Sequence, residues 1–78
     1  MDKRATALLA KGFKNEEDSS EFTLEIGNTV VSVWLTDREA MLVNVWNHYT
    51  FREKMHCYYT VAAITKLVIK IKSTHVHS

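Results

Sequence analysis

The chain has 78 residues, of which 46% are hydrophobic and 24% are charged, with no proline, two glycines and a formal net charge of +1. This length suits one domain around a single core, and the apolar content is too high for a disordered chain. No apolar run approaches the length of a membrane span, and the N-terminus lacks the apolar region of a signal peptide. Cys57 is the only cysteine, which excludes an intramolecular disulfide and fits a reducing compartment. We therefore expect a cytoplasmic domain at residues 1–72, followed by a flexible tail at residues 73–78.

Residues 2–11 are predicted to form a short helix. Ala5 and Leu8 recur on one stripe, Asp2 can cap the first turn, and Gly12 suits the exit. Because an isolated helix of this length is marginal in water, we expect it to pack against the rest of the chain.

Residues 21–50 carry the strongest pattern in the sequence, which predicts a three-stranded antiparallel meander. Gly27-Asn28 is typical of a two-residue hairpin turn, and an odd-numbered loop at residues 37–39 is expected to form the second turn. These turns place aliphatic residues together on one face, whereas a one-residue slip would mix the two faces. The predicted pairs on the aliphatic face are Ile26–Thr29, Leu24–Val31, Phe22–Val33, Val31–Val45, Val33–Val43 and Leu35–Met41.

The opposite face of this meander combines polar residues with large apolar ones. The predicted register sets Val30 opposite Trp46 and Trp34 opposite Leu42, with His48 farther along the third strand. Tryptophans among polar neighbours are typical of binding sites. This patch is therefore expected either to bind a partner protein or to be covered by the N-terminal helix or by a second copy of the chain.

Residues 51–72 allow two interpretations. Thr50 and Glu53 match a capping box, which predicts a helix at about residues 51–63. Residues 66–72 then alternate between basic and apolar side chains, which predicts a fourth strand, parallel to the first or third strand after a right-handed crossover. No glycine or turn residue separates the two segments, so one helix reaching residue 72 is the alternative. The predicted fold class is a small α+β domain of order α-β-β-β-α-β.

Sequence motifs for catalysis or metal binding are missing. The four histidines and Cys57 match no zinc-ligand spacing, and no acid lies at a recognisable spacing to support Cys57 as a nucleophile. There is no glycine-rich phosphate loop either. We therefore expect no enzymatic activity, no cofactor and no metal.

Charge is distributed unevenly along the chain. Residues 15–50 hold seven carboxylates against one arginine, whereas residues 51–78 hold five lysines and arginines against Glu53. Lys66, Lys70 and Lys72 share one side of the predicted fourth strand. There they either protect an edge strand from aggregation or contact nucleic acid.

The order α-β-β-β-α also occurs in double-stranded-RNA-binding domains. The start of the second predicted helix nevertheless carries an acid, Glu53, and no lysine cluster, and the predicted sheet is acidic. The similarity is one of topology only.

These patterns favour a small protein-interaction module, an adaptor or an inhibitor, of the kind common among bacteriophage and mobile-element accessory proteins. It is expected to bind another protein or a second copy of itself, and not a membrane. The predicted partner-binding residues are Val30, Trp34, Leu42, Trp46 and His48. The alternative is a nucleic-acid-associated protein that uses Lys66, Lys70 and Lys72.

Overall fold

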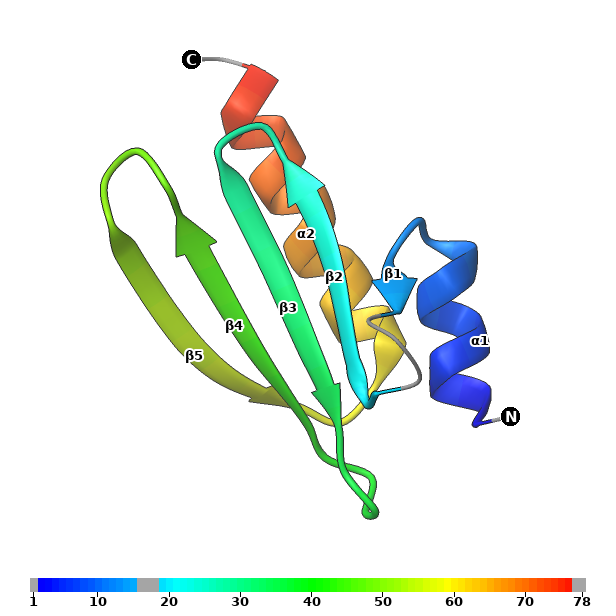
Figure 1. Cartoon of the computed structure of the whole chain (residues 1–78). Coiled ribbons are helices and arrows are strands. Elements are labelled where there is room, and N and C mark those ends of the chain that lie inside the picture. The colour runs from blue at the N-terminus through cyan, green and yellow to red at the C-terminus, as the bar shows by residue number, and fades with distance from the viewer. Residues whose placement is uncertain (1, 16–18, 77–78) are drawn as a thin grey trace.

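The structure is a computed structural model that describes residues 2–15 and 19–76 of the chain. An antiparallel sheet is preceded by one helix and followed by another, which makes an α+β domain (Figure 1). The strands lie in chain order across the sheet, β1-β2-β3-β4-β5. The elements are α1 (Lys3–Ala10), β1 (Lys14–Asn15), β2 (Glu21–Ile26), β3 (Thr29–Leu35), β4 (Met41–Asn47), β5 (Arg52–Tyr58) and α2 (Val61–Val76).

The first helix, α1, is confirmed together with its cap. Asp2 is the N-cap, and its Oδ1 accepts the backbone N–H of Arg4 at 2.8 Å. Gly12 follows the helix with φ +97°, a conformation that glycine adopts without strain. Ala5 and Leu8 are buried, so the helix packs through its predicted stripe.

The register of β2, β3 and β4 is also confirmed. Ile26 pairs with Thr29 across the turn at Gly27, where φ is +58°. Leu35 pairs with Met41, so the second turn spans residues 36–40 instead of 37–39 and keeps the odd length that the pattern requires. Every predicted pair on the aliphatic face is present.

The structure corrects the prediction for residues 51–72. The predicted helix at residues 51–63 is wrong, because most of this segment is strand β5, and the predicted strand at residues 66–72 is wrong, because it lies within helix α2. The alternative, a helix reaching residue 72, is right only for the part after residue 60. The similarity to the order of double-stranded-RNA-binding domains ends here, because a further strand replaces the expected helix.

Thr50 does not begin a helix because Asn47 makes a turn instead. The side-chain Oδ1 of Asn47 accepts the backbone N–H groups of Tyr49 and Thr50 at 2.9 and 3.0 Å, and its carbonyl accepts the N–H of Phe51 at 2.9 Å. The chain then reverses, and β5 pairs with β4 along its whole length. This pairing overrides the helix propensity of arginine, glutamate, lysine and methionine.

Helix α2 begins after Thr60, whose Oγ1 accepts the backbone N–H of Ala63 at 3.2 Å. Ile64 and Val68 are buried in the core, and Ile71 is packed against it, a spacing typical of one helix face. The helix continues to residue 76, so the predicted tail at residues 73–78 overlaps it, and residues 77 and 78 lie outside the described residues.

Both helices pack on the aliphatic face of the sheet. In Figure 1, α2 crosses behind β2 and β3, and α1 stands beside the short edge strand β1. The core between these layers consists of Ala5, Leu8, Phe13, Phe22, Ile26, Val31, Val33, Met41, Val43, Ile64 and Val68. Across residues 2–15 and 19–76, no helix covers the other face of the sheet.

Candidate functional site

The uncovered side of the sheet, which we call the open face, brings the predicted partner-binding residues together. Val30 lies opposite Trp46, and Trp34 lies opposite Leu42, as predicted. His48 lies beyond the end of β4, where its Nδ1 accepts the indole N–H of Trp46 at 3.0 Å. The open face consists of Lys14, Glu21, Thr23, Glu25, Val30, Ser32, Trp34, Leu42, Asn44, Trp46, Glu53, Met55 and Cys57.

Strand β5 and the turn before it add apolar residues that the sequence interpretation missed. Met55 is 60% exposed and lies opposite Asn44, and Cys57 is a free, exposed cysteine. Phe51 is 76% exposed, and its ring centroid lies 6.2 Å from that of Trp46. The signal that could have found Met55 and Cys57 is a period of two along β5, which sets Arg52, Lys54 and His56 on one side of the strand and Glu53, Met55 and Cys57 on the other. The helix prediction concealed it.

Asn44 lies at the centre of the open face with only part of its hydrogen-bonding capacity used. Its Nδ2 donates to Oε2 of Glu53 at 3.3 Å. Its Oδ1 is buried and accepts no hydrogen bond from any residue that the structure describes. An orphaned buried acceptor costs about 1–3 kcal/mol, so Asn44 is unfavourable for folding stability.

The rim of the open face is acidic. Glu21 and Glu25 border it on β2, and Glu53 borders it on β5. Among the described strand positions of this face, the one cation is Lys14, which lies opposite Thr23 on β1. The open face therefore presents apolar side chains between carboxylates.

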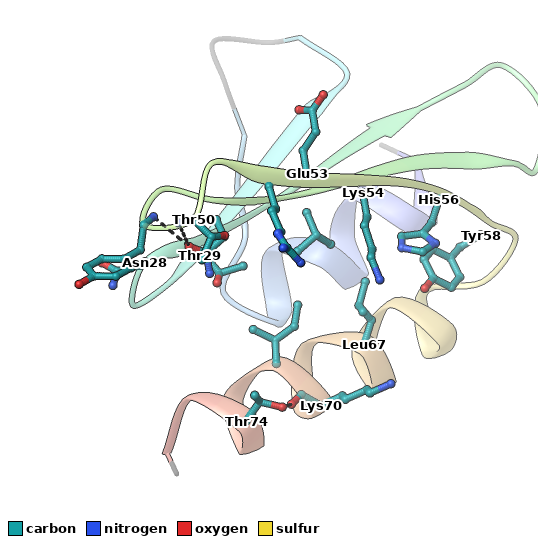
Figure 2. A pocket seen from close by; sticks show the side chains of 15 residues that line it. Asn28, Thr29, Thr50, Glu53, Lys54, His56, Tyr58, Leu67, Lys70 and Thr74 are labelled. Carbon is teal, nitrogen blue, oxygen red and sulfur yellow. Dashed lines mark hydrogen bonds between the residues drawn. The ribbon is translucent and has the colours of Figure 1, made fainter. Parts of the chain in front are cut away.

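A second surface lies on the helix side of the sheet, where a groove of about 860 Å³ separates β5 from residues 67–74 of α2 (Figure 2). We call it the basic groove. Its sheet wall carries Arg52, Lys54, His56 and Tyr58, and its helix wall carries Leu67, Lys70, Ile71 and Thr74. Residues Asn28, Thr29, Val45, Asn47, Tyr49, Thr50 and Glu53 complete the lining.

The cations of the basic groove have no acidic partner within residues 2–15 and 19–76. The ion pair found there joins Asp2 to Arg4, on helix α1. Glu53 borders the groove through its position on β5, but Figure 2 shows its side chain pointing away from α2. The side chain is turned to the open face, where it contacts Asn44.

The three predicted lysines are separated by the helix. Lys66 and Lys70 are one turn apart on α2, whereas Lys72 follows Lys70 by only two positions and points to another side. The prediction that they share one face of a strand is therefore wrong. Of the three, Lys70 alone lines the basic groove.

The histidines and the cysteine do not converge in the described part of the chain. His56 and Cys57 are neighbours on β5 and therefore lie on opposite faces of the sheet, and no group of three potential ligands was found there. None of the described helices has the length and apolarity needed to cross a membrane.

Comparisons with protein-family models, curated proteins and solved structures found no match to this chain. The open face and the basic groove are therefore the features from which a function can be inferred.

Proposed function

We propose that the chain is a protein-interaction module whose open face binds a partner protein. The observation that carries this proposal is that both helices pack on one face of the sheet and leave Trp34, Trp46, Leu42 and Met55 on the other. A solvated face of an antiparallel sheet normally carries polar side chains. Two tryptophans, a leucine and a methionine on such a face are typical of a binding surface.

Two features of the open face support the proposal because they are unfavourable for folding. Asn44 leaves a buried acceptor without a donor. Phe51 has φ +56°, a conformation that costs a bulky side chain about 1–3 kcal/mol, while its ring remains largely exposed. Residues that reduce stability without a structural gain are expected at functional sites.

Charge identifies the kind of partner. The acidic rim favours a protein whose apolar contact residues are surrounded by lysine and arginine. A second copy fits less well, because a symmetric dimer would place the same acidic rim against itself. Binding in this manner, the module acts as an adaptor or an inhibitor. We place the interaction in the cytoplasm, where the exposed thiol of Cys57 stays reduced.

The test compares two surface substitutions that introduce the same charge. Met55 on the open face and Ile69 on α2 are each 60% exposed, so Met55→Glu and Ile69→Glu are both expected to fold. The wild type and both variants are immobilised to capture partners from an extract of the source organism, and affinity for the purified partner is measured by calorimetry. Met55→Glu is expected to weaken binding by roughly 30-fold, the effect of an interface residue worth about 2 kcal/mol.

The control is expected to bind like the wild type, because Ile69 does not lie on the open face. Circular dichroism checks that both variants keep the native secondary structure. A partner that binds Met55→Glu as tightly as the wild type, or that is lost equally with Ile69→Glu, contradicts the proposal. An affinity that does not fall with rising salt contradicts the assignment of a basic partner.

A further inference from the structure

The fully buried part of the hydrophobic core ends at β4. On β5, Tyr58 still packs against the core, and the residues before it carry basic side chains. On the helix side, β4 presents Met41, Val43 and Val45. The paired positions of β5 are Tyr58, His56 and Lys54, with Arg52 opposite Asn47. The sheet therefore extends past its core, and the space between β5 and α2 becomes a groove with basic walls.

From this geometry we infer that the basic groove binds a nucleoside phosphate, either free or as part of a single-stranded nucleic acid. Its volume of about 860 Å³ falls within the range of about 300–1,000 Å³ that is typical of small-molecule sites. This inference goes beyond the proposed function, because it concerns the opposite face of the sheet and a ligand of opposite charge.

Cations on both walls of the groove provide the phosphate site. Arg52 and Lys54 come from β5 and Lys70 comes from α2, and Figure 2 shows Lys54 reaching from the strand toward Leu67 on the helix. None of the three forms an ion pair with a carboxylate of the described residues, so their charges are free to meet a phosphate. Arginine and lysine are the side chains that proteins use to bind phosphate groups.

The rest of the lining suits a base and a sugar. The ring centroids of His56 and Tyr58 lie 5.9 Å apart on the sheet wall. Aromatic side chains of this kind stack on nucleic-acid bases whatever the base sequence. Leu67 and Ile71 line the helix wall and give a base an apolar surface. Thr50 is one of the polar residues at the end of the groove that can bond a ribose or a base edge.

The experiment uses the full chain and fluorescence anisotropy with a short labelled oligouridine at low salt, with unlabelled AMP and inorganic phosphate as competitors. Lys54→Gln and Lys70→Gln are each expected to weaken binding about tenfold, the effect of one lost charge-assisted contact, and to reduce the salt slope by about one unit. Lys66→Gln is the matched control. It removes the same charge from the same helix, one turn away and outside the groove, and is expected to bind like the wild type.

The competitors distinguish the two sources of the ligand. If AMP displaces the labelled oligouridine and Lys70→Gln weakens the binding of AMP as well, a free nucleotide is sufficient as the ligand of the groove. Binding of the oligouridine alone, with that dependence, identifies the single strand. The inference is overturned if neither probe binds at low salt, if Lys66→Gln weakens binding as much as Lys70→Gln, or if inorganic phosphate competes as well as AMP.

Discussion

Asp2 and Arg4 join the first helix to the sheet through a small set of polar contacts. Asp2 caps α1, and its carboxylate pairs with the Arg4 guanidinium at 2.7 Å. The same guanidinium donates to the backbone carbonyls of Thr36 and Arg38, each at 2.7 Å, in the loop between β3 and β4. The two residues thus cap the helix and connect it to a loop more than 30 positions away.

These contacts predict how stability depends on pH. Hydrogen bonds from the Arg4 side chain and then from its backbone N–H lower the pKa of Asp2 from 3.8 to about 2. Because the pKa is lower in the folded state, the carboxylate stabilises the fold above the unfolded pKa of 3.8, and this stabilisation is lost as the pH falls to about 2. We expect Asp2→Asn, which still caps the helix, to lose less thermal stability than the wild type across this range. The unfolding temperature of each protein is measured at pH 2 to 7, with circular dichroism as the probe of unfolding.

Arg4→Gln provides the control, because it removes the cation that lowers the pKa of Asp2 but leaves the carboxyl group in place. Its unfolding temperature is expected to depend less on acid pH than that of the wild type, as in Asp2→Asn. Identical acid profiles for all three proteins would show that the contact does not act as described.

At the scale of elements, the central three strands were predictable because local and long-range signals agree there. Gly27 fixes the first turn locally, and the register that follows from it collects aliphatic residues on one face. The second turn lacks a glycine, yet only an odd loop keeps Val33 opposite Val43. The positions of Val30, Trp34, Leu42 and Trp46 on the open face therefore followed from the pattern alone. Met55 and Phe51 did not, because they depend on β5.

The C-terminal third was not predictable because its local signals conflict with its tertiary pairing. Thr50 and Glu53 match a capping box. The side chain of Asn47 nevertheless accepts the backbone N–H groups of the two residues before Phe51, and the segment that follows pairs with the edge of β4 as a strand. The sequence of residues 66–72 fits both the period of a strand and the apolar stripe of a helix. The segment is helical because Ile64 and Val68, one turn apart, are both buried in the core. The basic groove could not be foreseen, because its walls exist only if residues 52–58 form a strand and residues 61–76 form a helix.

The two threonines give a direct test of where the last helix begins. Thr60 accepts the N–H of Ala63, so Thr60→Ala is expected to lower the free energy of unfolding by about 1 kcal/mol. Thr60→Asp keeps the cap and is expected to retain most of the stability. Thr50→Ala at the exposed turn is expected to change it by less than about 0.5 kcal/mol. Denaturant unfolding measures all three, and a larger loss for Thr50→Ala would favour a helix that begins at the capping box.

At the scale of the whole molecule, the sheet separates two surfaces of opposite charge. The open face has an acidic rim with Glu21, Glu25 and Glu53, and the groove on the helix side has Arg52, Lys54 and Lys70. The net charge of +1 conceals this separation. The two proposed sites, for a protein partner and for a nucleoside phosphate, therefore lie on different surfaces and do not compete.

The acidic rim also predicts the state of association. At low salt we expect a monomer of 9.0 kDa, because a symmetric contact through the open face opposes like charges. At about 1 M salt the Debye length falls to about 3 Å, so the repulsion is screened while the apolar attraction remains. The mass from light scattering, with a reductant to keep Cys57 free, is then expected to rise with concentration for the wild type and for Ile69→Glu but not for Met55→Glu. A dimer at low salt that Met55→Glu dissociates would instead make a second copy the occupant of the open face.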